Sequence, residues 1–201
     1  TRFGNLGNVL AEDSSQTNVF TLESPVLTNG MFDKMKEYFD KTAYEIDCTL
    51  SLDAQGQLAD HALRDALQRL RVEAEDAVRQ GFSHLFLSDA ESGPDKIPMP
   101  MILAVGGVHS HLVAQGLRTY TSINVRSAEC LDTHYFAVLI GVGATTINPY
   151  LAFESIADRH SRDLFDNLSL DQCIENYRKV VDQGILKIMS KMGISVIASY
   201  R

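Results

Sequence analysis

The chain has 201 residues, which is long enough to bury one hydrophobic core. Its 45% hydrophobic and 22% charged residues are typical of a globular protein. Its 18 Lys and Arg against 26 Asp and Glu give a formal charge of −8 at pH 7, which argues against nucleic acid or an anionic membrane as the main partner. The longest apolar run, residues 136–142, is far shorter than a membrane span.

The cysteine pattern predicts neither a disulfide framework nor a zinc knuckle. Cys48, Cys130 and Cys173 are far apart, odd in number and without CxxC spacing, which favours a reducing, cytoplasmic compartment. The sequence opens on Thr1 without the features of a signal peptide and stops at Arg201 directly after an apolar run. We therefore expect a segment of a longer polypeptide.

The first half of the chain is predicted to begin irregularly and then to alternate between helix and strand. Residues 1–27 are rich in Gly, Asn, Ser and Asp and lack a sustained period, whereas 28–201 are expected to form the body of a single α/β domain. A helix capped by Thr28 or Asn29 and running to 39 is followed by a strand over 44–52. The strongest helical pattern covers 58–80 and ends before Gly81, and a strand over 82–88 and a loop over 89–96 follow. Two prolines, at 98 and 100, are expected to open the next helix, which reaches about residue 115.

The second half continues the alternation. Strands are predicted over 121–125 and 144–147, with helices over 134–140 and from Pro149 onward. Ser169 and Gln172 form a capping box for a helix that reaches residue 192, with a break or bend at Gly184 and a stop at Gly193. A fifth strand is predicted over 194–199. Because a helix separates every pair of strands, we expect a parallel sheet of about five strands with crossover helices.

Polar side chains follow the predicted strands, where parallel α/β folds place their ligand-binding groups. These side chains could bind a ligand, but capping of the next helices or anchoring of a neighbouring domain is the favoured interpretation. They are Ser88, Asp89, Glu91, Arg126, Ser127, Glu129, Asn148, Tyr150, Ser199, Tyr200 and Arg201.

Three histidines and two glycine motifs invite more specific hypotheses. His109, His111 and His134 suggest a metal site, but two histidines at i and i+2 point about 200° apart on a helix, so packing is favoured. Glycines 106 and 107 lie within a predicted helix and indicate a close approach of a neighbouring element. The Gly-Val-Gly motif at 141–143 follows a helix and precedes a strand, the reverse of a phosphate-binding loop, and is interpreted as a helix stop.

A set of ordered motifs resembles the central domain of the glutamate synthase large subunit. They are LESPVL (22–27), IPMPMILAVGGVHSHL (97–112), GLRT (116–119), IGVGA (140–144), INPYLAFE (147–154), NYRK (176–179), GILKIMSKMGIS (184–195) and SYR (199–201). Two positions depart from the family's usual pattern: Ala90 stands where a basic residue is usual, and Ser110 where a histidine is usual.

The resemblance implies an incomplete β/α barrel inside a larger enzyme. In that family an amidotransferase domain releases ammonia from glutamine, and a tunnel delivers the ammonia to 2-oxoglutarate. The imine is then reduced at FMN to L-glutamate. A 3Fe-4S cluster carries electrons from NADPH, NADH or ferredoxin, and NADPH-dependent forms carry FAD on a small partner subunit.

For this chain the resemblance implies a non-catalytic connector between the amidotransferase and FMN domains, with a share in their interfaces and in the tunnel. No catalytic, cofactor-binding or metal-binding residue is expected in it, and the isolated segment is expected to be inactive and prone to self-association. Two alternatives remain open. One is a free-standing β/α ligand-binding domain or enzyme that uses the strand-end residues, and the other is a regulatory metal-binding module built on the three histidines.

Overall fold

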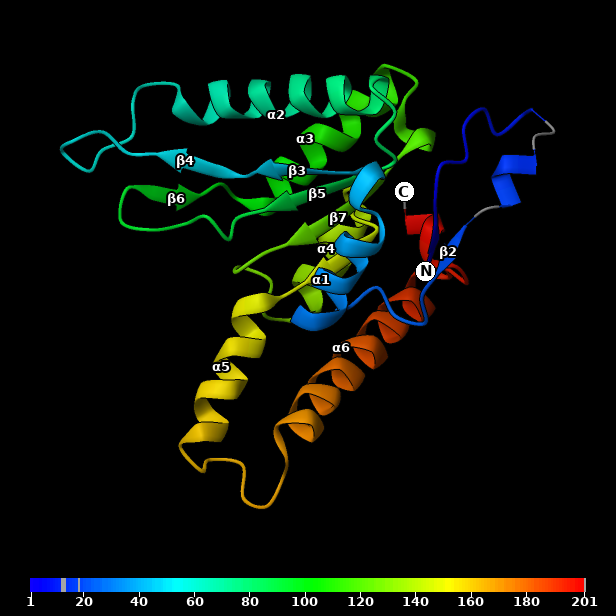
Figure 1. Cartoon of the computed structure of the whole chain (residues 1–201). Helices are drawn as coiled ribbons and strands as arrows, with labels where there is room; N and C mark the ends of the chain where they lie inside the picture. Colours follow the sequence, from blue (N-terminus) through cyan, green and yellow to red (C-terminus); the bar gives the residue numbers. More distant parts are fainter. Residues whose placement is uncertain (12–13, 18, 201) are drawn as a thin grey trace.

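The computed structural model describes residues 1–11, 14–17 and 19–200, and it is built on a parallel sheet of four strands (Figure 1). The strands are β3 (Ala43–Asp47), β5 (His84–Ser88), β7 (Ser122–Arg126) and β8 (Thr146–Asn148), in the order β3-β5-β7-β8. Each strand therefore lies beside the next one in the chain, as in a β/α barrel. Helices connect the strands, so the predicted α/β fold with crossover connections is confirmed.

One face of the sheet is apolar and is covered by the connecting helices. These are α2 (Ala62–Arg79), α3 (Met101–Ala114) and α4 (Thr133–Gly141), and α5 (Tyr150–Ser161) and α6 (Leu170–Met192) follow β8. Side chains on this outer face are fully buried in the main core: Leu85, Leu87, Ile123, Val125 and Ile147. Burial of these branched side chains supplies most of the sheet's stabilisation.

The opposite, inner face is covered by α1 (Asn29–Tyr38) and the N-terminal segment. Phe32 of α1 packs edge-on against Phe86 of β5, with ring centroids 5.3 Å apart. Side chains alternate along a strand, and most of the apolar ones point to the outer face. Most of the other residues on the inner face are therefore polar. They include His84, Ser122, Asn124, Thr146 and Asn148, all of them buried.

The N-terminal segment contains two short antiparallel strands, β1 (Arg2–Phe3) and β2 (Phe20–Thr21). It also supplies a parallel bridge between Val26 and Ile147, at the side of the sheet beyond β8. There Leu27 N–H donates to the Ile147 carbonyl (2.9 Å), and Ile147 N–H donates to the Pro25 carbonyl (2.8 Å). Residues 25–27 thus take the place of a fifth strand.

The fifth strand predicted over 194–199 is wrong. Gly193, with φ 70°, closes α6, and a 3-10 helix, η4 (Ile197–Tyr200), follows. The position beside β8 is already filled by residues 25–27, and the C-terminal segment packs on the core through Ile194, Ile197 and Tyr200 instead. The other 3-10 helices are η1 (Ser14–Thr17), η2 (Asp40–Thr42) and η3 (Arg118–Tyr120).

The strand predicted over 44–52 is divided in two. The peptide of Cys48 leaves the parallel sheet, donating to the Ser88 carbonyl (2.8 Å) and accepting from Met99 N–H (2.9 Å). Beyond it β4 (Thr49–Ser51) pairs in antiparallel fashion with β6 (Lys96–Pro98), which the sequence reading left within a loop and at the start of a helix.

Two predicted helix ends are confirmed, and one predicted bend is wrong. Both hydrogen bonds of the Ser169–Gln172 capping box are formed, and Gly81 follows α2 with φ 98°. Helix α6 instead runs without interruption through Gly184, where an added Cβ would lie 2.4 Å from Thr133 Cγ2. This glycine permits the close approach of α4 to α6. Within the described residues no helix is both long and apolar enough to cross a membrane.

Candidate functional site at the carboxyl edge of the sheet

The four parallel strands end side by side at what we call the carboxyl edge. In register across it lie Asp47, Ser88, Arg126 and Asn148. The strand-end residues predicted for β5, β7 and β8 are therefore brought together. Ser199 and Tyr200 are not part of this row because no fifth strand forms, and Arg201 lies outside the described residues.

Asp89 is the centre of the carboxyl edge and is fully buried. Its carboxylate accepts from Ser127 Oγ (3.1 Å) and from Ala128 N–H (3.0 and 3.1 Å), and it also bonds the Tyr150 hydroxyl. Burial raises the pKa of Asp89 above its ordinary value, and these hydrogen bonds offset only part of that increase. Burial, together with the Asp89 charge, raises the pKa of Tyr150 to about 12. Asp89 thus joins the ends of β5 and β7 to the start of α5.

Arg126 and Asn148 complete the middle of the edge. The Arg126 guanidinium lies between the rings of Phe32 (5.8 Å) and Tyr150 (5.4 Å), and its Nη1 is 3.3 Å from Asp33 Oδ1. Asn148 Nδ2 donates to the Leu27 carbonyl (3.0 Å) and to Asn29 Oδ1 (2.9 Å). Two buried atoms here, Arg126 Nε and Asn148 Oδ1, have no hydrogen-bond partner among the residues that the structure describes.

Glu129, another of the predicted strand-end residues, caps α3, the helix that precedes β7 in the chain. Its Oε2 accepts from Met101 N–H (3.0 Å) at the start of α3 and from the Tyr135 hydroxyl. The Met101 amide is one of the donors that a helix start leaves unpaired, so this contact is a cap.

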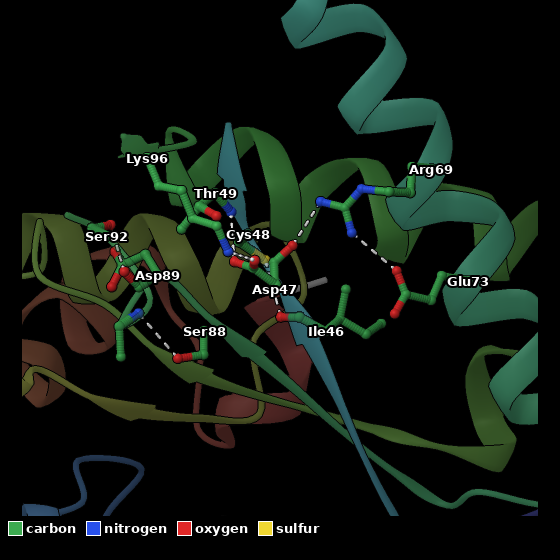
Figure 2. Close-up of polar contacts among 11 residues, drawn as sticks. Ile46, Asp47, Cys48, Thr49, Arg69, Glu73, Ser88, Asp89, Ser92 and Lys96 are labelled. Carbon is green, nitrogen blue, oxygen red and sulfur yellow. Dashed lines mark hydrogen bonds and ion pairs between the residues drawn. The ribbon is translucent and has the colours of Figure 1, made fainter. Parts of the chain in front are cut away.

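Sequence reasoning missed the end of β3, which Figure 2 shows. Lys96 Nζ lies 3.2 Å from Asp47 Oδ2, and Arg69 Nη2 donates to the Asp47 carbonyl (2.8 Å). Burial raises the pKa of Asp47, but hydrogen bonds from Thr49 and Lys96 and the Lys96 charge outweigh it, so the pKa is lowered overall. Had the predicted strand ended at Asp47 rather than at residue 52, Asp47 would have been recognised as a strand-end residue.

The three histidines do not form a common site. Arg118 Nε donates to His109 Nδ1 (3.0 Å), His111 Nε2 lies 2.7 Å from Glu75 Oε2 on α2, and His134 is exposed. Over the described ranges, no group of three or more His, Cys, Asp or Glu side chains could hold a metal ion.

The close approach predicted at glycines 106 and 107 and the helix stop predicted at 141–143 are both confirmed. A Cβ on Gly107 would lie 2.4 Å from Leu67 Cδ1, so α3 and α2 are in close contact there. Gly143 has φ 123° and follows the end of α4, and a Cβ would lie 2.5 Å from His109. Both positions require glycine for steric reasons.

The three cysteines are free and buried. Burial is the main cause that raises the pKa of Cys48 to about 12, and it also raises that of Cys130. At neutral pH both are thiols, whereas nucleophiles and cluster ligands are thiolates.

The sequential strand order defines the class, an α/β protein built like part of a β/α barrel. A solved structure with this fold, an A198G:L230A mutant flavocytochrome b2 with pyruvate bound, aligns with a TM-score of 0.50 and 14% identity over 88% of this chain and 52% of that one. The glutamate synthase central domain family matches residues 1–201, and the chain belongs to that family.

Relatives support this assignment along the whole chain. The glutamate synthase [NADPH] large chain of Azospirillum brasilense is 58% identical over 100% of this chain, and that of Bacillus subtilis is 37% identical over 100%. The ferredoxin-dependent chloroplastic glutamate synthase of Spinacia oleracea is 38% identical over 98%. These relatives are oxidoreductases, and this chain spans 13% of the length of each.

Proposed function

We propose that this chain is a non-catalytic connector within a glutamate synthase, between the amidotransferase domain and the FMN-binding domain of the same polypeptide. The complete cytoplasmic enzyme would make L-glutamate from glutamine and 2-oxoglutarate with electrons from NADPH, NADH or ferredoxin. The connector would space the two active sites and contribute to the domain interfaces and to the wall of the ammonia tunnel. Residues 1–201 would form one domain.

The observation that carries this proposal is that the central carboxylate of the carboxyl edge is bound by groups of the protein itself. Asp89, the group best placed for acid–base chemistry, is fully buried and hydrogen-bonded to Ser127, Ala128 and Tyr150. A general base must instead reach a substrate proton. We therefore assign no catalytic residue to this chain.

The cofactors of the complete enzyme would be held elsewhere. The buried thiols of Cys48, Cys130 and Cys173 do not gather into a group of three within the described residues, so they do not fit a 3Fe-4S cluster. FAD would belong to a small partner subunit in the NADPH-dependent form.

Exposed apolar side chains support a role in domain contacts. They gather on α5, α6 and the turn between them, which extend away from the sheet in Figure 1. Exposed apolar side chains on neighbouring elements are a feature of interaction sites. The residues are Leu151, Leu164, Leu168, Val180, Leu186 and Met192, between 41% and 64% exposed.

The test uses the full-length enzyme that carries this chain, with Val180→Ser and Leu186→Ser combined. A loosened domain contact should reduce glutamine-dependent glutamate formation about fivefold while leaving ammonia-dependent formation unchanged. A loss of only the glutamine-dependent activity would indicate impaired transfer of ammonia between the two active sites rather than impaired chemistry at the flavin.

The control is Leu63→Ser with Val72→Ser on α2, two apolar residues that are 40% and 46% exposed. Both activities should stay at wild-type level. Equal losses of the two activities in the α6 variant would contradict the connector role, and so would stoichiometric flavin bound to residues 1–201 alone.

A further inference from the structure

A cavity of about 690 Å³ lies at the amino edge of the sheet, the end where β5 and β7 begin. The N-terminal segment, the end of α1 and the residues before β7 surround it. Its volume falls in the range of about 300–1,000 Å³ that is typical of small-molecule sites. The ring side chains in the lining are Phe3, Phe20, Tyr38, Phe39, His84 and Tyr120.

A buried chain of hydrogen bonds runs across three strands to this cavity. Thr146 Oγ1 donates to Asn124 Oδ1 (2.8 Å), and Asn124 Nδ2 donates to the Leu85 carbonyl (3.2 Å) and to Ser122 Oγ (2.9 Å). The carbonyl contact fixes the orientation of the Asn124 amide, since a carbonyl can only accept. Ser122 Oγ therefore already accepts one hydrogen bond.

The same chain sets the tautomer of His84. Ser122 Oγ lies 2.8 Å from His84 Nδ1. Because Ser122 Oγ already accepts from Asn124, its own proton is free to be donated. The Ser122 hydroxyl uses that proton when it donates to His84 Nδ1. The proton of the neutral imidazole then lies on Nε2.

The His84 ring is held rigidly and faces the cavity with one open atom. It stacks on Phe39, with centroids 3.7 Å apart and planes 17° from parallel, and contacts the edge of Phe3 at 5.9 Å. Burial lowers its pKa to about 4, so the ring is neutral at pH 7. Nε2 has no hydrogen-bond partner among the described residues, and it is not one of the unpaired atoms sealed from solvent.

The lining residues that the structure describes carry no charge to balance a charged ligand. Among the described lining residues none is Asp, Glu, Lys or Arg, and the polar groups are amides, hydroxyls and the neutral imidazole. Burying an ion without a counter-charge is costly.

We propose that this cavity binds an uncharged, planar small molecule that carries a hydrogen-bond acceptor. The acceptor takes a hydrogen bond from the Nε2–H of His84, and the ring of the ligand packs against the ring side chains that line the cavity. This site is separate from the connector function and from the carboxyl edge.

The test compares three probes of one shape on the full-length protein. Benzamide is neutral and carries a carbonyl acceptor, benzoate is an anion, and benzamidine is a cation. Saturation-transfer NMR titrations should give a Kd for benzamide at least about fivefold lower than for either ion.

Two variants examine the contacts separately. Ser122→Ala removes the donor that keeps the His84 proton on Nε2. Phe39→Leu removes the ring that stacks on His84. Each variant should weaken benzamide binding about fivefold. The exposed Ser155→Ala on α5 is the matched control and should bind as the wild type does. Thermal unfolding of each variant confirms that it is folded.

Several results would overturn the proposal. These are tighter binding of benzoate or benzamidine, unchanged benzamide binding in both variants, or no benzamide binding at all. The last result is expected if a segment of a neighbouring domain fills the cavity in the full-length protein.

Discussion

The two ends of the same parallel sheet differ in how their polar groups are used. At the carboxyl edge Asp89 receives its hydrogen bonds from the protein itself, and it ties β5, β7 and α5 together. At the amino edge a similar buried network ends at a cavity and leaves His84 Nε2 open. The contacts of Asp89 thus lie at the end of the sheet where α/β enzymes place their chemistry, and the opposite end has the open Nε2 atom beside a cavity. A conserved location in a fold does not establish a function.

The largest expected effect comes from breaking the closed edge with Asp89→Ala. The substitution leaves Ser127 Oγ, Ala128 N–H and the Tyr150 hydroxyl without their acceptor, and it should lower the free energy of unfolding by about 3 kcal/mol. Urea unfolding measures this loss. The exposed Asp60→Ala should change the value by less than about 0.5 kcal/mol. A loss as small as that at position 89 would show that the edge is not held by this carboxylate.

The network behind the open edge is tested by Asn124→Ala. Thr146 Oγ1 and the Leu85 carbonyl each lose a buried partner, and we expect a loss of about 2 kcal/mol in the free energy of unfolding. The exposed Asn176→Ala provides the control. In histidine NMR, Asn124→Ala should also shift the ring nitrogens of His84, whereas unchanged His84 signals would argue against a connected network.

The neutrality of His84 predicts a dependence of stability on pH. Its pKa is lowered from 6.5 to about 4 on folding, so between these values the unfolded chain binds more protons than the folded one. This contribution to stability is complete above pH 6.5 and is lost as the pH falls. From pH 6.5 to roughly pH 5 the loss is about 1.5 kcal/mol. The difference between wild type and His84→Gln across this window measures it, and parallel curves would contradict a buried neutral ring.

The smallest expected effect concerns the rim of the closed edge. Asp33 is 62% exposed where it meets Arg126, so Asp33→Ala should cost less than about 0.5 kcal/mol. Urea unfolding with and without added salt provides the measurement. A loss above 1 kcal/mol, weakened by salt, would show that this ion pair, rather than the Asp89 contacts, holds the carboxyl edge.

Much of the fold follows from local sequence signals. The Ser169–Gln172 capping box, the apolar strand at 84–88 and the glycines after α2 and α3 lie where the periodicity places them. Local signals were insufficient where distant segments compete for the same place. Residues 25–27 take the position beside β8, so the apolar run at 194–199 has no strand to pair with. The turn at Cys48 likewise depends on the distant Met99.

The candidate sites were predictable to different degrees. Strand order alone brings Ser88, Arg126 and Asn148 to one edge, and the sequence reading placed them there. The amino-edge network was missed, although polar residues at 122, 124 and 126 alternate with Ile123 and Val125. That alternation indicates a sheet with one polar face. The sequence does not show that α1 and the N-terminal segment bury this face, and burial is the cause of the lowered pKa of His84.

The pairing of Leu27 with β8 also has a consequence for the order in which the protein folds. Asn148 Nδ2 donates to the Leu27 carbonyl across 121 residues of chain. Contacts this distant in sequence form slowly because bringing the two segments together costs the entropy of the chain between them. On the ribosome the N-terminal segment is synthesised early but has no strand to pair with until β8 emerges. Residues 25–27 therefore cannot take their place until β8 has formed, and until they do β8 presents an unpaired strand edge.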